Sequence, residues 1–67
     1  MRAFLSSFLM DDVMQTVDAA VHRHGIVNVP QLAEEIRRRN VAENVALEDI
    51  EARVLMRAQA RGAAMEF

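Results

Sequence analysis

Residues 24–40 read HGIVNVPQLAEEIRRRN, and this stretch decides the fold because it separates two helices. Gly25 is typical of the position just after a helix, where the backbone often turns left-handed. The β-branched residues among 26–29 favour one short strand. Pro30 then favours the first turn of a new helix, because an N–H at that position would have no partner within the helix.

The segment before this stretch, from about Ser7 to His24, is predicted to be a helix. Its apolar residues recur at spacings of three and four, which places them along one side of a helix. They are Met10, Val13, Met14, Val17 and Val21. Ser6 and Ser7 are suited to cap the N-terminus of this helix.

The segment after residues 24–40 is predicted to hold the third helix, from an N-cap at Asn44 to a stop at Gly62. Five of its apolar residues fall within one arc and form the buried side. They are Leu47, Ile50, Val54, Leu55 and Ala58. In the second helix, which ends near Asn40, Leu32 and Ile36 face inward.

Residues 1–67 are predicted to fold as one small helical domain, in which residues 1–9 form an apolar N-terminal arm. Apolar residues make up 52% of the chain and charged residues 27%, a balance typical of a folded protein. The predicted fold class is mainly α. It is a three-helix arrangement in which residues 26–29 can pair with residues 64–67 as a minimal two-stranded sheet.

The chain has no cysteine, which excludes disulfides and thiolate metal sites and favours a cytoplasmic location. Its start, MRAFLSSFLMDD, is apolar only briefly, because Asp11 and Asp12 interrupt it before membrane-spanning length. It also lacks the hydrophobic region and cleavage site of a signal peptide. We therefore expect it to belong to the mature protein, and we expect no contact with a membrane.

No pattern of residues predicts catalysis, a cofactor or a metal site. The sequence contains no nucleophile with a recognisable base and no glycine-rich loop. His22 and His24 are two positions apart, so on a helix their rings point about 200° away from each other and do not share a metal ion. We expect a protein that is not an enzyme.

The order of helix, short strand, helix, loop, helix and final extended segment resembles the winged helix-turn-helix superfamily. HGIVNVPQLAEEIRRRN and VALEDIEARVLMRAQARGAAMEF carry the resemblance, which covers about residues 13–67. It implies that VPQLAEEI is the supporting helix and ALEDIEARVLMRAQARG the recognition helix. The function it implies is that of a DNA-binding transcriptional regulator. Four arginines would contact phosphates: Arg37, Arg53, Arg57 and Arg61.

The charges of the third helix also suit a helix that only faces water. Glu48, Asp49 and Glu51 lie in its first turns and the arginines follow at intervals of four, which is the order that the helix dipole favours. Carboxylates at the start of a recognition helix would repel phosphates, and the net charge of the chain is −2. DNA binding is therefore the less favoured function.

The helices are also predicted to carry contacts between side chains one turn apart. Acids four residues before a base give this pairing its favourable direction. The predicted pairs are Glu34–Arg38, Glu35–Arg39, Asp49–Arg53 and Asp18–His22. They leave Arg37 without a partner in its own helix.

Surplus apolar residues are the strongest functional signal in the sequence. Four of them in the N-terminal arm are predicted to lie off the buried side of the first helix: Phe4, Leu5, Phe8 and Leu9. Met56, with Ala52 and Ala60, forms an apolar ridge opposite the buried side of the third helix. These four residues of the arm, together with Met56, predict a non-catalytic interaction module that homodimerises or binds another protein. The alternative is an arm folded back over its own core.

Overall fold

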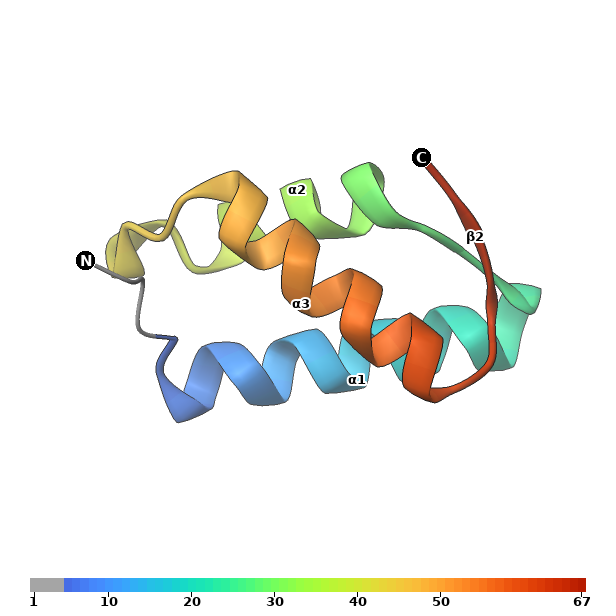
Figure 1. The fold of residues 1–67 in the computed structure, drawn as a ribbon. Coiled ribbons are helices and arrows are strands. Elements are labelled where there is room, and N and C mark those ends of the chain that lie inside the picture. The colour runs from blue at the N-terminus through green and yellow to red at the C-terminus, as the bar shows by residue number, and fades with distance from the viewer. Residues whose placement is uncertain (1–4) are drawn as a thin grey trace.

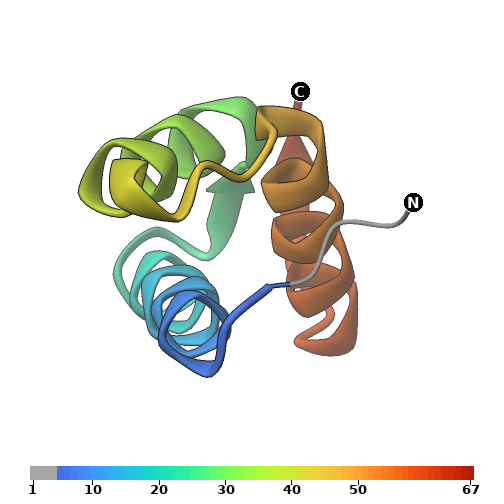
Figure 2. The same ribbon diagram turned by 90° about the vertical axis from the view of Figure 1, so that its left-hand side faces the viewer.

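Three helices and a two-stranded sheet make up the computed structural model, which describes residues 5–67 (Figure 1). The elements in chain order are α1 (Ser7–His24), β1 (Ile26–Asn28), α2 (Val29–Arg39), the 3₁₀ helix η1 (Val41–Glu43), α3 (Leu47–Ala60) and β2 (Ala64–Glu66). This confirms the predicted mainly α fold with minimal β pairing. Figure 2, which looks along the bundle, shows the three helices around a common centre.

Local hydrogen bonds fix both ends of α1 where the sequence predicted them. The Ser6 side chain accepts a hydrogen bond from the Leu9 N–H at 3.1 Å, and its hydroxyl donates to Glu43 of η1 at 2.8 Å. At the other end Gly25 has a φ of 71°, and its N–H donates to the Val21 carbonyl at 2.9 Å. The chain can therefore reverse at Gly25 and enter β1 at once.

The sheet closes one end of the bundle. β1 and β2 are parallel, with the register Ile26↔Ala64, Val27↔Met65 and Asn28↔Glu66, because α2 and α3 carry the chain back between them. Val27 is fully buried and Met65 packs against the core, whereas Ala64 and Glu66 are exposed. The sheet thus contributes one face to the core and leaves the other in water.

The core consists only of aliphatic side chains from all three helices and β1. Its buried residues are Leu9, Val13, Val17, Val27, Val29, Ala33, Ile36, Ile50, Val54 and Ala58. No polar side chain is buried among residues 5–67. Two predictions for α1 were wrong: Leu9 lies inside the core, and Met14 is exposed. The reason is that Leu9, Val13 and Val17 recur every four residues, which turns the buried side of α1 away from Met14.

The start of α3 differs from the prediction. Asn44 does not cap it, because Asn44 adopts a left-handed conformation with φ 54° and ends η1. Asparagine tolerates this conformation better than most residues, so the tight turn uses it. α3 begins at Leu47, after Ala46, which makes no side-chain cap. Its far end agrees with the prediction: the helix stops at Ala60, and Gly62 turns left-handed two residues later.

We predict that Ile36→Ala lowers the free energy of unfolding by ~2–4 kcal/mol, because it removes a fully buried side chain from a core this small. Val41→Ala, at an exposed apolar residue of η1, is the control and should cost less than ~0.5 kcal/mol. Chemical denaturation measures both. Equal effects would show that α2 does not anchor the core through Ile36.

Candidate interaction surfaces

Asp18 of α1 binds two arginines of α3. The Arg57 Nε donates to Asp18 Oδ1 at 3.0 Å and the Arg57 Nη2 to Oδ2 at 2.8 Å, while the Arg61 Nη1 lies 3.2 Å from Oδ1. These hydrogen bonds, first of all those from Arg57, lower the pKa of Asp18 below its ordinary value of 3.8. The cluster joins α1 to α3 along their shared flank, and it replaces the predicted contact between Asp18 and His22.

The predicted phosphate-binding arginines mostly have carboxylate partners already. Arg57 and Arg61 bind Asp18, and Arg37 binds Glu34 of its own helix with distances of 3.0 and 2.8 Å. Arg37 was predicted to lack such a partner, so that prediction was wrong. Arg53, which is half-buried, forms no ion pair with any carboxylate among residues 5–67.

None of the predicted ion pairs at spacings of four is present within the described chain. Glu34 forms its ion pair with Arg37, three residues later in α2. The side chain of Arg39 extends across to α1, where it pairs with Asp12. The physical reason is that long arginine side chains reach neighbouring helices as easily as the next turn of their own. A sequence reading limited to one helix does not include those partners.

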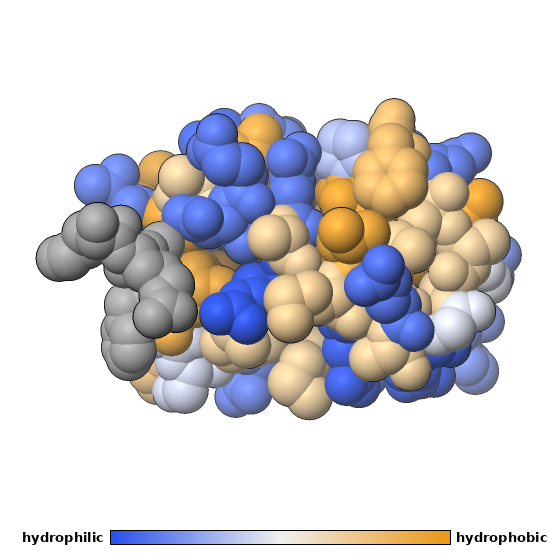
Figure 3. Space-filling model, viewed as in Figure 1, coloured by the Kyte–Doolittle hydropathy of each residue, from blue (hydrophilic) through white to orange (hydrophobic). Residues whose placement is uncertain are grey.

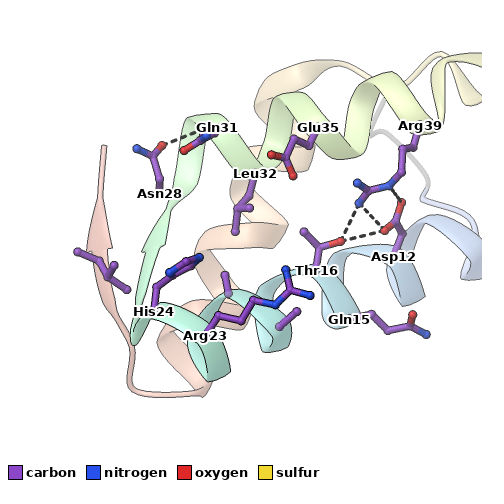
Figure 4. Close-up of a pocket in the computed structure, with 13 residues that line it drawn as sticks. Asp12, Gln15, Thr16, Arg23, His24, Asn28, Gln31, Leu32, Glu35 and Arg39 are labelled. Carbon is purple, nitrogen blue, oxygen red and sulfur yellow. Dashed lines mark hydrogen bonds and ion pairs between the residues drawn. The ribbon is translucent and has the colours of Figure 1, made fainter.

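A polar groove lies between α1 and α2 (Figure 4), on the side of these helices that faces away from α3. Its volume is about 490 Å³. At one end the Arg39 guanidinium donates to Asp12 at 3.2 and 2.7 Å and to the Thr16 hydroxyl at 2.8 Å, and Asn40 donates to Asp12 at 2.8 Å. Burial raises the pKa of Asp12, but these hydrogen bonds outweigh burial and bring the pKa below 3.8.

The rest of this groove is lined by side chains of both charges, with a few apolar side chains among them. Arg23 from α1 and Glu35 from α2 point into it from opposite sides, with Leu32 between them (Figure 4). Across residues 5–67, no three or more histidine, aspartate or glutamate side chains are placed to hold a metal ion. The contacts of Asp12 with Arg39 and Asn40 at one end of this groove join α1 to α2.

The opposite side of the molecule carries an apolar surface, which we name the α3–β2 face and define as Ala52, Met56, Ala60 and Phe67. All four are exposed, and the side chains of Phe67 and Met56 are 79% and 55% exposed. In Figure 3 apolar surface continues from the middle of α3 toward β2, interrupted by a few charged side chains. This face adjoins a shallow groove of about 370 Å³, lined by Val29, Pro30, Glu48, Glu51, Ala52, Leu55 and Phe67.

The residues predicted for the N-terminal arm fall into three groups. Phe4 lies outside the described residues. Leu9 is buried and Leu5 is half-buried against the same core, so Leu9 belongs to the domain's own interior and not to a partner surface. Phe8 is 81% exposed, as predicted. The structure thus supports an intramolecular role for part of the arm and leaves Phe8 in water.

Phe67 is the residue that the sequence prediction missed. It directly follows the last strand residue, and the predicted interface named only phenylalanines of the arm. The available signal was that a phenylalanine beyond a strand of three residues, in a domain whose core is filled by aliphatic side chains, has little interior left to enter. Placing Phe67 outside the core also required the parallel register of β1 and β2, which the composition of the chain does not predict.

No helix within residues 5–67 combines the length and the hydrophobicity that crossing a membrane requires. Comparison of the chain with models of protein families, with curated proteins and with solved structures finds no match.

We predict that Asp18→Asn destabilises the fold at neutral pH and that this effect fades in acid. The pKa of Asp18 is lower in the folded chain, so its ion pairs stabilise the fold fully above 3.8 and lose this effect as the pH falls further. Thermal unfolding of the wild type and the variant at several pH values measures the difference. Asp11→Asn, at an exposed aspartate without an ion pair among residues 5–67, is the matched control. A difference between wild type and Asp18→Asn that stays constant into strong acid would contradict the assignment.

Proposed function

We propose that this chain is a non-catalytic interaction module that associates with a second copy of itself through the α3–β2 face. The observation that carries the proposal is the position of the aromatic side chains. The core is filled by leucine, isoleucine, valine and alanine alone, and both phenylalanines among residues 5–67 are about four-fifths exposed, at 81% and 79%. Phenylalanine buries more apolar area than any of these core residues, so leaving it in water needs a reason.

For Phe67, a second copy supplies that reason, because small domains gain stability from shared apolar surface. A 67-residue chain without cysteine has few other means of adding stability. A two-fold arrangement closes on itself when one surface contacts its own copy, so a single face serves both subunits. A standard interface covers about 800 Å² of each partner, whereas the entire molecule exposes 4583 Å². One phenyl ring does not cover such an area, but α3 and β2 together run across the middle and one end of the side seen in Figure 1.

The α3–β2 face is a better contact than the N-terminal arm. It holds two large exposed apolar side chains, Phe67 and Met56, together with a groove of about 370 Å³ beside Phe67. The described part of the arm offers only Phe8, because Leu5 and Leu9 already pack in the domain. Met56, predicted from the sequence as part of the interface, is common to both versions of the proposal.

The order of elements also resembles the winged helix-turn-helix superfamily, which would favour DNA binding. The charges of the domain, however, favour DNA binding less than they favour contact with another protein chain. Exposed Glu48 lies in the first turn of α3, where a recognition helix would approach the bases, and Arg57 and Arg61 already bind Asp18. Binding DNA would require these arginines to exchange a carboxylate for phosphates, which gains less than binding with free arginines.

For self-association we predict that the wild-type chain sediments as a dimer at high concentration. Phe67→Ser combined with Met56→Ser should give a folded monomer, because it removes the largest apolar side chains of the face. Phe8→Ser is the matched control, since it makes the same change at another exposed phenylalanine and should leave the dimer intact. Loss of the dimer in Phe8→Ser alone would instead place the interface on the N-terminal arm.

For nucleic acid we predict no sequence-selective complex with duplex DNA at physiological salt. A gel-shift assay over a range of salt concentrations tests this, because phosphate contacts make affinity fall steeply as salt rises. Suppose that the wild type forms a salt-sensitive complex, and that the double variant Arg53→Ala with Arg57→Ala shows a shallower fall of affinity with salt, by about two phosphate contacts. This result would favour DNA binding over the proposed function.

A further inference from the structure

We infer that the free edge of β2 pairs with the β2 edge of a second copy, which would make one four-stranded sheet across the dimer. The inference rests on the self-association proposed above and adds its geometry. The sheet has the order β1-β2, so β2 has a strand neighbour on one side only. Ala64, Glu66 and Phe67 are exposed, and in Figure 1 no helix passes in front of β2. Alternate backbone N–H and C=O groups of β2 therefore point away from β1, with no second strand to bond them.

Although β2 is short, with three residues, its edge lacks several features that usually prevent strands from pairing with another chain. Natural edge strands are commonly protected by lysine, proline, a bulge or a covering loop. Residues 63–67 read AAMEF, which contains no lysine and no proline, and the three residue pairs with β1 follow one another without a bulge. The only charge is Glu66, so the position of that carboxylate determines which register is open to a second strand.

One antiparallel register suits two identical strands. A two-fold axis at Met65 places Ala64 opposite Glu66 of the partner subunit, uses all three residues of β2 and keeps the two carboxylates diagonal to each other. An axis at Glu66 would place the two carboxylates directly opposite, which is unfavourable. An axis at Ala64 would place Glu66 opposite Gly62 of the partner subunit, outside the strand. The register centred on Met65 is therefore the one that the charges and the strand length favour.

The same register removes the exposed ring of Phe67 from water. Counting outward from Met65, Phe67 falls opposite Ala63 of the partner subunit, where a small side chain leaves room for a phenyl ring. The pairing also lies on the side of the molecule that carries the α3–β2 face, because β2 lies in front of β1 in Figure 1, as α3 does. Backbone hydrogen bonds and apolar burial would then come from one continuous contact.

The outer edge of β1 is the competing position, and it is less open. Ile26 and Asn28 of β1 line the polar groove between α1 and α2, together with Arg23 and His24. The Asn28 side chain also accepts a hydrogen bond from the Gln31 N–H at 3.0 Å as the N-cap of α2. A strand added there would have to enter between two helices, whereas a strand added to β2 meets no described element.

Two variants that place opposite charges at position 64 test the register. Ala64 is exposed, so either change leaves the core undisturbed. In Ala64→Lys the introduced ammonium faces Glu66 of the partner subunit twice per dimer, so the dimer should dissociate less readily. In Ala64→Glu two carboxylates face each other twice, so it should dissociate more readily. Cross-strand pairs of this kind change the dissociation constant by roughly two- to thirtyfold for the two sites together. Sedimentation equilibrium measures the constants, and circular dichroism checks that each variant is folded.

Exchanging the charges at positions 64 and 66 tests the register most directly. Ala64→Glu combined with Glu66→Lys restores the opposite charges with their positions swapped, so the double variant should dimerise more tightly than Ala64→Glu alone. If both single changes weaken the dimer equally or neither alters it, the edge pairing is wrong although the self-association stands. A wild-type chain that remains monomeric at every concentration reached overturns the proposed function and this inference together.

Discussion

The packing of a small, purely aliphatic core is the constraint on which the rest of this structure depends. Ten buried side chains from α1, β1, α2 and α3 meet at the centre, and none of them is aromatic or polar. Because such a core buries a limited area, the helices are further joined at their flanks by carboxylate–arginine contacts, with Asp18 binding α3 and Asp12 binding α2. The phenylalanines at positions 8 and 67 stay outside.

These flanking contacts also decide what the arginines can do. An arginine that holds two helices together contributes to the fold through a bidentate contact, as Arg57 does with Asp18. The same side chain is then less available to a phosphate. The helix that resembles a recognition helix thus uses much of its positive charge within the domain, and its outer surface is apolar around Met56. This division of roles favours the proposed contact with a second protein chain over DNA binding.

Much of the fold could be predicted from local signals, whereas the candidate site could not. Gly25, Pro30 and the spacing of Val13 and Val17 act within a few residues, so they indicated the helices, the break and the strand correctly. The partners of Arg37, Arg39 and Arg57 depended on how whole helices lie against one another. The exposure of Phe67 depended on the register between β1 and β2, which joins residues almost forty positions apart. Leu9 was misplaced because the predicted buried side of the first helix began at Met10, whereas Leu9 lies one turn before Val13 on the same side.

We propose that a second copy completes the apolar surface that this core leaves exposed. The most direct test of this proposal is the unfolding temperature of the wild-type chain measured over about a hundredfold range of protein concentration, since association that requires folded subunits stabilises them by mass action. We expect the unfolding temperature to rise by roughly several degrees with concentration. An unfolding temperature that stays the same across the whole range would contradict it, because a folded monomer gains nothing from more copies of itself.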